Sequence, residues 1–428
     1  MNASFDRGDK LEGLEQGHVL SNIAGHPQEQ QLNVLVDITS LQAPLTGIGR
    51  YTLELLTQLQ QLPEQIELRG FNDCSCYEPP ALNTLLTVVG GPQKKTWPGL
   101  SAKHQAWQLA KHVLKCIPGA RKLRSSLQNK RIARALIQKE GSIYWQPNFI
   151  LGKSNGPSMV TVYDLSHVRL PHFHPPERLH WLQKGLAKTL DRASHIMTVS
   201  HFSKAEIIDV YGVPASKISV IYPGVADAFR RQYSLEELAV TKKKYNLPSQ
   251  YLLSLGTFEP RKNLKNLLQA YMLLAPSLRK RYPLVLVGGQ GWNHEETDKL
   301  IGQLQADGDL ITRGYVDQAD LPLLYKGASA FAYVSFYEGF GMPVAEAMAS
   351  GIPVVTSAGG SMEEVALGCA QLVDPEDVQS IAAGLSTVLE DLQSLRPRCE
   401  QAREKSKKYN WRLSAESLIN AAREVRQE

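Results

Sequence analysis

Long apolar runs and regularly spaced cysteines are both missing from this chain of 428 residues. No uncharged apolar stretch approaches the ~20 residues that a membrane-spanning helix requires, so an integral membrane protein is not expected. The cysteines are few, odd in number and scattered, and they form neither a CxxC pair nor a disulfide framework, which predicts a protein of the reducing cytoplasm. They are Cys74, Cys76, Cys116, Cys369 and Cys399.

A large excess of one charge sign is absent as well. The formal net charge of +5 is too small to indicate nucleic-acid binding by itself. Hydrophobic residues at 43% and charged residues at 21% exclude a wholly disordered, collagen-like or coiled-coil chain. The first thirty residues lack a basic segment followed by an apolar one, so no secretory signal is expected. Residues 1–31 are polar and aperiodic, and we interpret them as a flexible N-terminal tail.

The chain instead alternates short apolar strands with amphipathic helices. Its length exceeds the size at which one hydrophobic core usually stops growing, which predicts two domains. Continuous apolar strands between helices indicate parallel sheets covered on both faces. We therefore predict an α/β protein with two Rossmann-like, doubly wound domains that face each other across a cleft. The predicted strands span residues 32–38, 142–145, 159–163, 195–200, 251–255, 283–287, 310–315, 330–335 and 353–356.

The boundary between the domains is expected just after residues 221–225, where Pro223 and Gly224 precede a charged stretch with no strand signal. The predicted N-terminal domain then covers residues 32–228 and the C-terminal domain residues 229–408. We expect a last helix over residues 409–428 to cross back to the N-terminal domain. Because open parallel sheets bind ligands beyond the carboxyl ends of their strands, the site is expected between the domains.

The strongest functional motif is Tyr337–Met348, which reads YEGFGMPVAEAM. Its glycines let the backbone approach a ligand closely, and Pro343 suits the first position of a helix. Exposed amides at the positive end of that helix predict an anion site. Glu338 and Glu346 are expected to accept hydrogen bonds from vicinal hydroxyls of a ribose or a hexose. The amides in question belong to Phe340, Gly341 and Met342.

A second motif, Gly256–Asn263, places two cations in the turn between a strand and a helix. Arg261 offers a planar fork for phosphate oxygens, and Lys262 offers a compact point charge. Two fixed cations and a helix terminus neutralise a diphosphate leaving group without a metal ion. We therefore expect no cofactor and no metal. The alternative is an exposed basic turn.

The third motif, Thr46–Tyr51, is a glycine-containing turn after the first predicted strand. It lacks the third glycine and the acidic partner of a dinucleotide fingerprint, so a nicotinamide or flavin cofactor is not favoured. Gly47 and Gly49 are instead expected to press against the ligand from the opposite wall. Arg50 is a candidate contact for an acceptor.

These motifs, with residues 286–292, 314–316, 198–203 and 221–225, resemble glycosyltransferase family 4 over most of the chain from Leu32 onward. The resemblance implies the GT-B fold, a nucleotide-sugar donor, retention of anomeric configuration and no metal requirement. It extends to bacterial mannosyltransferases of surface polysaccharide and O-antigen synthesis. That implies a hexose, mannose-type favoured, moved from a GDP-linked donor to a lipid-linked saccharide at the cytoplasmic membrane face.

Carried over by position, the resemblance gives roles to the motif residues. Glu338 would contact the donor sugar, Glu346 the ribose, and Arg261 with Lys262 the diphosphate. The backbone at Val316 would border the base. The remaining donor contacts would come from Gly47, Gly49 and Gly256.

Tyr163 departs from the family pattern, because many members carry a histidine at this position near the reacting carbon. Asp164, His167 or the Tyr163 hydroxyl would then supply the polar contact, and the sequence leaves the choice open. A zinc site built on His167 and three nearby histidines is not favoured, because zinc needs ordered ligand geometry. The Ser203–Glu206 segment predicts a capping box, which gives Ser203 a structural role.

Ten basic residues and no acidic one lie between Lys103 and Lys139. This stretch is either an interfacial patch that contacts anionic lipid or a polyprenyl-phosphate acceptor, or a solvated basic face. Nucleic acid is not expected there, because too few aromatic residues are present for base stacking. Two other functions remain open: a non-catalytic sugar-nucleotide-binding scaffold, or a nucleotide-sugar epimerase of the same fold.

Overall fold

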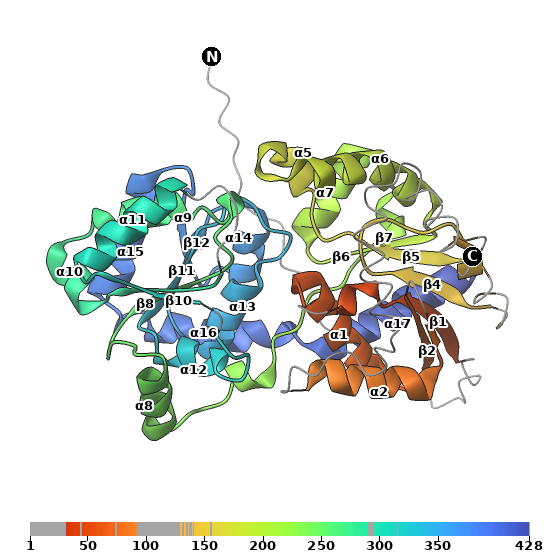
Figure 1. The fold of residues 1–428 in the computed structure, drawn as a ribbon, viewed down its shortest axis with the longest axis horizontal. Coiled ribbons are helices and arrows are strands. Elements are labelled where there is room, and N and C mark those ends of the chain that lie inside the picture. The colour runs from red at the N-terminus through yellow and green to blue at the C-terminus, as the bar shows by residue number, and fades with distance from the viewer. Residues whose placement is uncertain are drawn as a thin grey trace, which may run out of the picture. The chain divides into compact units, whose positions relative to one another are not determined.

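A computed structural model describes residues 31–427, apart from residues 43–44, 73–74, 92–128, 131, 134–135, 137–138, 140, 155, 290–294 and 315. The interpretation of residues 1–31 as a tail therefore falls, except for Gln31, outside the described residues. The same holds for most of the basic stretch from Lys103 to Lys139. The described part forms two α/β halves, each built around a mainly parallel sheet (Figure 1).

The first sheet has seven strands in the order β3-β2-β1-β4-β5-β6-β7. Neighbouring strands run parallel except for the short edge strand β3, which is antiparallel to β2. The strands are β1 (Leu32–Asp37), β2 (Ile66–Phe71), β3 (Cys76–Tyr77), β4 (Ile143–Gln146), β5 (Ser158–Thr161), β6 (His195–Thr198) and β7 (Ile218–Val220). The described helices of this half are α1 (Gly47–Leu59), α2 (Pro79–Gly90), α5 (Ser166–Arg169), α6 (Pro176–Arg192) and α7 (His201–Tyr211).

The second sheet has six strands in the order β10-β9-β8-β11-β12-β13, all parallel. They are β8 (Leu252–Leu255), β9 (Leu284–Val287), β10 (Leu310–Arg313), β11 (Ala330–Tyr333), β12 (Val354–Ser357) and β13 (Gln371–Val373). The associated helices are α8 (Leu235–Lys244), α9 (Leu264–Met272), α10 (Pro276–Arg281), α11 (Glu295–Ala306), α12 (Leu321–Gly327), α13 (Met342–Ser350), α14 (Gly360–Ala366), α15 (Val378–Glu390) and α16 (Arg396–Lys405). The last helix, α17 (Trp411–Gln427), belongs to the first sheet's half.

Short 3₁₀ turns join several of these elements. They are η1 (Thr39–Leu41), η2 (Pro171–Phe173), η3 (Ala215–Lys217), η4 (Asp227–Phe229), η5 (Pro260–Lys262) and η6 (Ser406–Lys408). The turn η5 lies inside the candidate site, and η2 lies close to it.

Every strand predicted from the sequence is present, and the prediction of two parallel sheets is confirmed. Strand β2 was not predicted, because Glu67 and Arg69 interrupt its apolar pattern. Arg69 is buried and donates to Ser142 Oγ at 2.8 Å, which satisfies its charge-bearing group inside the sheet. The three-residue strands β7 and β13 are too short to give a periodic signal.

The predicted capping box at Ser203 is wrong by one helical turn. Helix α7 begins at His201, and its N-cap is Ser200, whose side chain accepts a hydrogen bond from the Ser203 amide at 3.0 Å. Ser200, where the chain leaves β6, thus satisfies the Ser203 amide, which has no partner within the helix. The Ser203 hydroxyl is left to bind elsewhere, as described below.

The last helix, α17, packs against α1 and against strands β1, β4 and β5 of the first sheet, and Figure 1 shows it in blue beside α1. The Ser414 hydroxyl donates to the Tyr222 carbonyl at 2.5 Å, and the Val225 amide donates to the Tyr409 carbonyl at 3.0 Å. Gly224 makes this approach possible, since a Cβ there would lie 2.3 Å from the backbone nitrogen of Trp411. The exact domain limits at residues 228 and 408 stay predictions.

Candidate active site

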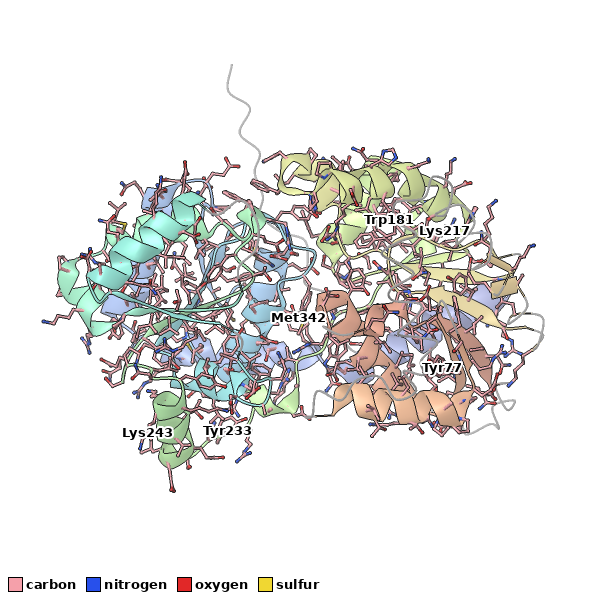
Figure 2. All side chains as sticks on the ribbon, in the orientation of Figure 1. Tyr77, Trp181, Lys217, Tyr233, Lys243 and Met342 are labelled. Carbon is pink, nitrogen blue, oxygen red and sulfur yellow. The ribbon has the colours of Figure 1, made fainter. Side chains whose placement is uncertain are left out.

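The loop from β11 to α13 carries the strongest motif. Gly341 adopts a left-handed backbone (φ 97°) and is the N-cap of α13, which begins at Met342 (Figure 2). No side chain caps this helix, and Pro343 occupies its first turn. Within the described residues, the amides of Phe340, Gly341 and Met342 donate to no protein acceptor. The helix start therefore keeps the unpaired amides that an anion requires.

The loop from β8 to α9 carries the two predicted cations, Arg261 and Lys262, within the turn η5. Strand β8 lies beside β11 in the sheet, so the loops that follow these strands meet at one edge. Asn263 fixes the end of the turn with a left-handed backbone (φ 59°), and its side chain donates to the carbonyls of Val334 and Pro375 at 2.9 and 2.7 Å. The cations are thus held by the register of two neighbouring strands.

Both cations contact Glu338. Lys262 Nζ lies 2.5 Å from Glu338 Oε1, and Arg261 Nη1 lies 2.7 Å from Glu338 Oε2. Tyr333 at the end of β11 completes the cluster, because its hydroxyl accepts from Lys262 at 2.7 Å and donates to Glu338 at 2.8 Å. Arg261 Nη2 also lies 3.1 Å from Glu259 Oε1. Two cations and two carboxylates are therefore in direct contact here.

The environment of Glu338 keeps it ionised. Burial alone would raise the pKa of this carboxyl, but the charges of Arg261 and Lys262 outweigh burial and lower its pKa to about 2. Burial likewise opposes the charge on Lys262, and the Glu338 carboxylate reverses this effect and raises the pKa of the lysine. The cations stay charged, and Lys262 retains one of its three N–H donors beyond the two contacts above.

Glu346 lies one turn inside α13, and its pKa is shifted in the opposite direction to that of Glu338. Burial raises its pKa to about 7, and neither the hydrogen bond from Tyr325 nor the charge of Arg50 fully offsets this. The Tyr325 hydroxyl donates to Glu346 Oε2 at 2.9 Å. This carboxyl therefore changes its protonation near neutral pH, whereas Glu338 does not.

Two glycines bring neighbouring loops of the second sheet into direct backbone contact. A Cβ at Gly288 would lie 1.8 Å from the Gly256 carbonyl oxygen, so no side chain fits at this crossing. Gly256 itself lines a small cavity of about 20 Å³ together with Thr257, Lys262 and Tyr333. Val316, the residue expected to border a base, is buried with 4% of its surface exposed.

The β11–α13 loop also touches the first sheet's half of the protein. A Cβ at Gly339 would lie 2.1 Å from the Tyr163 carbonyl oxygen. The hydroxyls of Ser200 and Ser203 donate to the Gly339 carbonyl at 2.6 and 3.2 Å, and Ser203 also reaches the Tyr163 carbonyl at 3.1 Å. Asp164 is thereby placed beside the Arg261–Glu338 cluster. Burial alone would lower the pKa of Arg261, but the charges of Glu338 and then of Asp164 outweigh burial and raise it.

The structure separates the three polar candidates around Tyr163. The Tyr163 hydroxyl donates to the Pro147 carbonyl at 2.8 Å, and its ring packs edge-on against Tyr51. Asp164 Oδ1 accepts from the Ser166 amide and hydroxyl at 3.0 and 2.6 Å. His167 is 1% exposed, and neither of its ring nitrogens has a partner among the described residues. Burial lowers the pKa of His167 to about 4, so it is neutral at pH 7.

The glycine-containing turn of the first half leads into α1, which begins at Gly47 because the Thr46 side chain caps the helix by accepting a hydrogen bond from the Gly49 amide. A Cβ at Gly47 would meet no atom within 4 Å, which leaves room for a ligand. A Cβ at Gly49 would lie 2.4 Å from the Ser40 carbonyl oxygen, so this glycine is explained by packing. Arg50 donates to Gln318 of the second half and lies close enough to Glu346 to lower its pKa.

Among the described residues, no group of three or more His, Cys, Asp or Glu side chains is arranged to hold a metal ion. Of the four histidines considered, His174 Nε2 lies 2.9 Å from Ser166 Oγ. Sequence reasoning missed Glu259, Tyr325 and Tyr333. Glu259 stands inside a motif already recognised, whereas the two tyrosines reach the site only through the packing of α12 and β11.

Comparison with known proteins identifies the family. Residues 45–229 match the description Glycosyltransferase Family 4, and residues 238–409 match Glycosyl transferases group 1. The chain is 35% identical over 391 residues to O-antigen chain mannosyltransferase B of Escherichia coli, covering 91% of this chain and 99% of that protein. The chain belongs to glycosyltransferase family 4. It is also 32% identical over 54% of its length to the serotype-specific mannosyltransferase WbdA of Escherichia coli, of which it covers 28%.

Solved structures show that this family 4 member has the GT-B fold. A glycosyltransferase from Rickettsia africae superposes with a TM-score of 0.65 at 17% identity, over 92% of this chain and 98% of that one. Sucrose-phosphate synthase from Thermosynechococcus elongatus gives a TM-score of 0.65 at 18% identity, over 92% and 99% of the two chains. Among the described residues, no helix combines the length and the apolar character that crossing a membrane requires.

Proposed function

We propose that this glycosyltransferase moves mannose from GDP-mannose to a saccharide acceptor in O-antigen synthesis, with retention of anomeric configuration. The observation that carries the proposal is the cluster of Arg261, Lys262 and Glu338 at the uncapped start of α13, in a chain similar over nearly its full length to an O-antigen mannosyltransferase. The cluster provides what a sugar diphosphate needs. The relative supplies the choice of sugar.

The donor would bind along the edge of the second sheet. Its diphosphate accepts hydrogen bonds from Arg261, Lys262 and the free amides of Phe340–Met342, while Glu346 accepts hydrogen bonds from the ribose hydroxyls. Val316 would border the base, and Gly47 with Gly256 would leave room for the donor. Glu338 forms ion pairs with both cations. When the diphosphate binds, it takes over part of these contacts, and the Glu338 side chain turns toward the sugar hydroxyls.

The transfer step needs charge stabilisation more than it needs a protein nucleophile. The bond from the anomeric carbon to the phosphate oxygen breaks, and its electron pair stays on the departing GDP. The acceptor oxygen forms the new bond on the same face of the sugar, and its proton passes to the departing phosphate oxygen. Arg261 and Lys262 stabilise the negative charge that develops on that phosphate, which is a large contribution in a site with little water.

Asp164 is our choice among the polar groups that replace the family histidine. Its charge acts on Arg261 and its Cβ lies close to Gly339, whereas the Tyr163 hydroxyl is hydrogen-bonded to the Pro147 carbonyl and His167 is buried. An anionic group at that position stabilises the positive charge that develops on the sugar ring. The proposal includes no metal and no cofactor, because the two cations and the helix start take over the role of a metal ion.

We further propose that the acceptor is a lipid-linked saccharide and that the enzyme works at the cytoplasmic face of a membrane. Support comes from the similarity to O-antigen mannosyltransferases and from the basic stretch Lys103–Lys139, which the structure leaves mostly undescribed. Binding of the purified chain to vesicles with and without anionic lipid tests this part separately.

The test of the donor is a thermal-stability screen with GDP- and UDP-sugars, followed by a transfer assay with the ligand that stabilises most. A ligand present at about 100 times its Kd stabilises the fold by ~2.7 kcal/mol, which is readily seen as a higher Tm. We expect GDP-mannose to stabilise most and to yield GDP and a mannoside with retained configuration. Binding without turnover would favour a scaffold, and turnover with the nucleotide still attached would favour an epimerase.

A further inference from the structure

A cavity of about 440 Å³ adjoins the candidate site, and the proposed reaction makes no use of it. Three phenylalanine rings line it. Phe173 comes from η2 in the first half of the chain, and Phe258 and Phe336 come from the loops after β8 and β11. Its volume lies within the ~300–1,000 Å³ typical of sites for small molecules.

The rings are arranged to contact a flat, partly apolar ligand. Phe173 and Phe336 lie 5.8 Å apart between ring centres and nearly parallel, with an interplanar angle of 23°. All three rings are half-buried, so each keeps an accessible part. A sugar ring has an apolar C–H face and a rim of hydroxyls, and aromatic side chains with polar neighbours suit that combination.

A buried polar atom on the wall lacks a partner. Asn263 is 2% exposed, and its amide nitrogen is bound to two carbonyls as described above. Its oxygen Oδ1 is buried and accepts no hydrogen bond from the described residues. An unsatisfied buried acceptor costs about 1–3 kcal/mol. Asn266 stands next to it on the same wall.

The charges around the cavity favour a neutral ligand over an anionic one. Lys265 on the wall forms an ion pair with Glu296, with 2.5 Å between Lys265 Nζ and Glu296 Oε2. The other carboxylate, Glu259, is 3.1 Å from Arg261. No unpaired cation remains among the described lining residues to hold a phosphate, so a nucleotide or a lipid phosphate is disfavoured.

The cavity is directly connected to the reaction site. Glu259 lines the cavity and binds Arg261, which in turn binds Glu338. The amide of Phe336 donates to the Arg261 carbonyl at 3.0 Å. A ligand in the cavity therefore lies next to the group that holds the donor.

We propose that this cavity binds the saccharide of the acceptor, namely the sugars that precede the one receiving mannose. Phe173, Phe258 and Phe336 contact the sugar faces. The inference rests on the proposed function, because it assigns the acceptor of the same reaction to a place. It also predicts that longer saccharides bind better than a single mannose.

The test is calorimetric binding of a mannose tetrasaccharide, and of mannose as the short probe, to the full chain in the presence of GDP. We expect the tetrasaccharide to bind more tightly than mannose. Phe258→Ala and Phe173→Ala each weaken tetrasaccharide binding about fivefold, because each removes one aromatic contact. Phe258→Tyr keeps the ring and keeps the affinity. Leu273→Ala, an exposed leucine at the end of α9 outside the cavity, is the matched control and changes nothing.

Binding does not depend on turnover, so the two proposals fail separately. A chain that binds the tetrasaccharide with this aromatic dependence but transfers no mannose supports the cavity assignment and refutes the proposed function. Equal tetrasaccharide affinity in wild type, Phe258→Ala and Phe173→Ala overturns the cavity assignment. Absence of any tetrasaccharide binding by the wild type at millimolar concentration overturns it as well. Thermal unfolding of both alanine variants checks that each is folded.

Discussion

Two glutamates in one motif differ in protonation because their neighbours differ. Glu338 faces Arg261 and Lys262, which lower its pKa to about 2. Glu346 is buried beside the Tyr325 hydroxyl, and its pKa rises to about 7. The spacing in the sequence predicted that both carboxylates serve one site. It did not predict their electrostatics, because the cations come from another loop and Tyr325 from another helix.

Donor affinity is expected to depend on pH through Glu346. The ionised carboxylate accepts two hydrogen bonds from a ribose, so GDP-mannose affinity rises as pH increases from 6 to 8 through the pKa near 7. Both phosphates of GDP-mannose are esterified, which leaves Glu346 as the main titrating group. Glu346→Gln binds more weakly, and its affinity does not change over this range. Calorimetric titrations of the two proteins across the range measure the difference, and parallel profiles would contradict the role of Glu346.

Stability without ligand is expected to change in the other direction. The folded pKa of Glu346 is raised above the value of 4.5 for an unperturbed glutamate. The stabilising effect of the bound proton is therefore fully present below pH 4.5 and is lost as pH rises through 7. The Tm of the wild type should fall relative to that of Glu346→Gln between pH 5 and 8. A constant difference in Tm would show that the carboxyl titrates elsewhere.

At the scale of elements, the β11–α13 connection positions the chemistry. It leaves β11 at Tyr333, carries Glu338 past Arg261 and Lys262, and turns into α13 at Gly341. The glycines and the proline of the motif predicted the strand, turn and helix correctly. Its contact with Tyr163 and the serines of α7 was not predictable, because backbone proximity between distant segments leaves no local pattern in the sequence.

Gly339→Ala is expected to displace this connection. The new Cβ would lie 2.1 Å from the Tyr163 carbonyl oxygen, so the loop must shift and move Glu338 with it. A displacement of about 1 Å costs roughly 10²-fold in transfer rate. Gly302→Ala is the matched control, because a Cβ there meets no atom within 4 Å on helix α11 and should keep or slightly raise stability. Equal transfer rates for both variants would show that the β11–α13 connection does not position Glu338 for the reaction.

At the scale of the molecule, α17 ties the end of the chain to the first sheet. Leu418 on this helix is fully buried, whereas Leu413, five residues earlier, is 50% exposed. The alternation of strands and helices predicted two parallel sheets, and apolar periodicity predicted a helix at the C-terminus. The contacts through Gly224, Tyr222 and Ser414 depend on side-chain fit and carry no such signal.

Leu418→Ala is expected to lower the free energy of unfolding by about 2–5 kcal/mol, because it leaves a cavity between α17 and the first sheet. Leu413→Ala removes the same atoms from an exposed position and should change stability by less than about 0.5 kcal/mol. Urea unfolding monitored by circular dichroism compares the two. Similar losses in both variants would mean that α17 does not hold the sheet.

The central claim is that Arg261, Lys262 and the start of α13 hold the diphosphate of a nucleotide sugar while Glu346 holds the ribose. Calorimetric titration of GDP into wild type, Lys262→Ala, Glu346→Ala and Lys280→Ala tests it most directly, since Lys280 is an exposed lysine of α10 that belongs to none of the motifs. We predict about tenfold weaker binding for Lys262→Ala and Glu346→Ala, and unchanged binding for Lys280→Ala. Wild-type affinity for GDP in all three variants would contradict the claim.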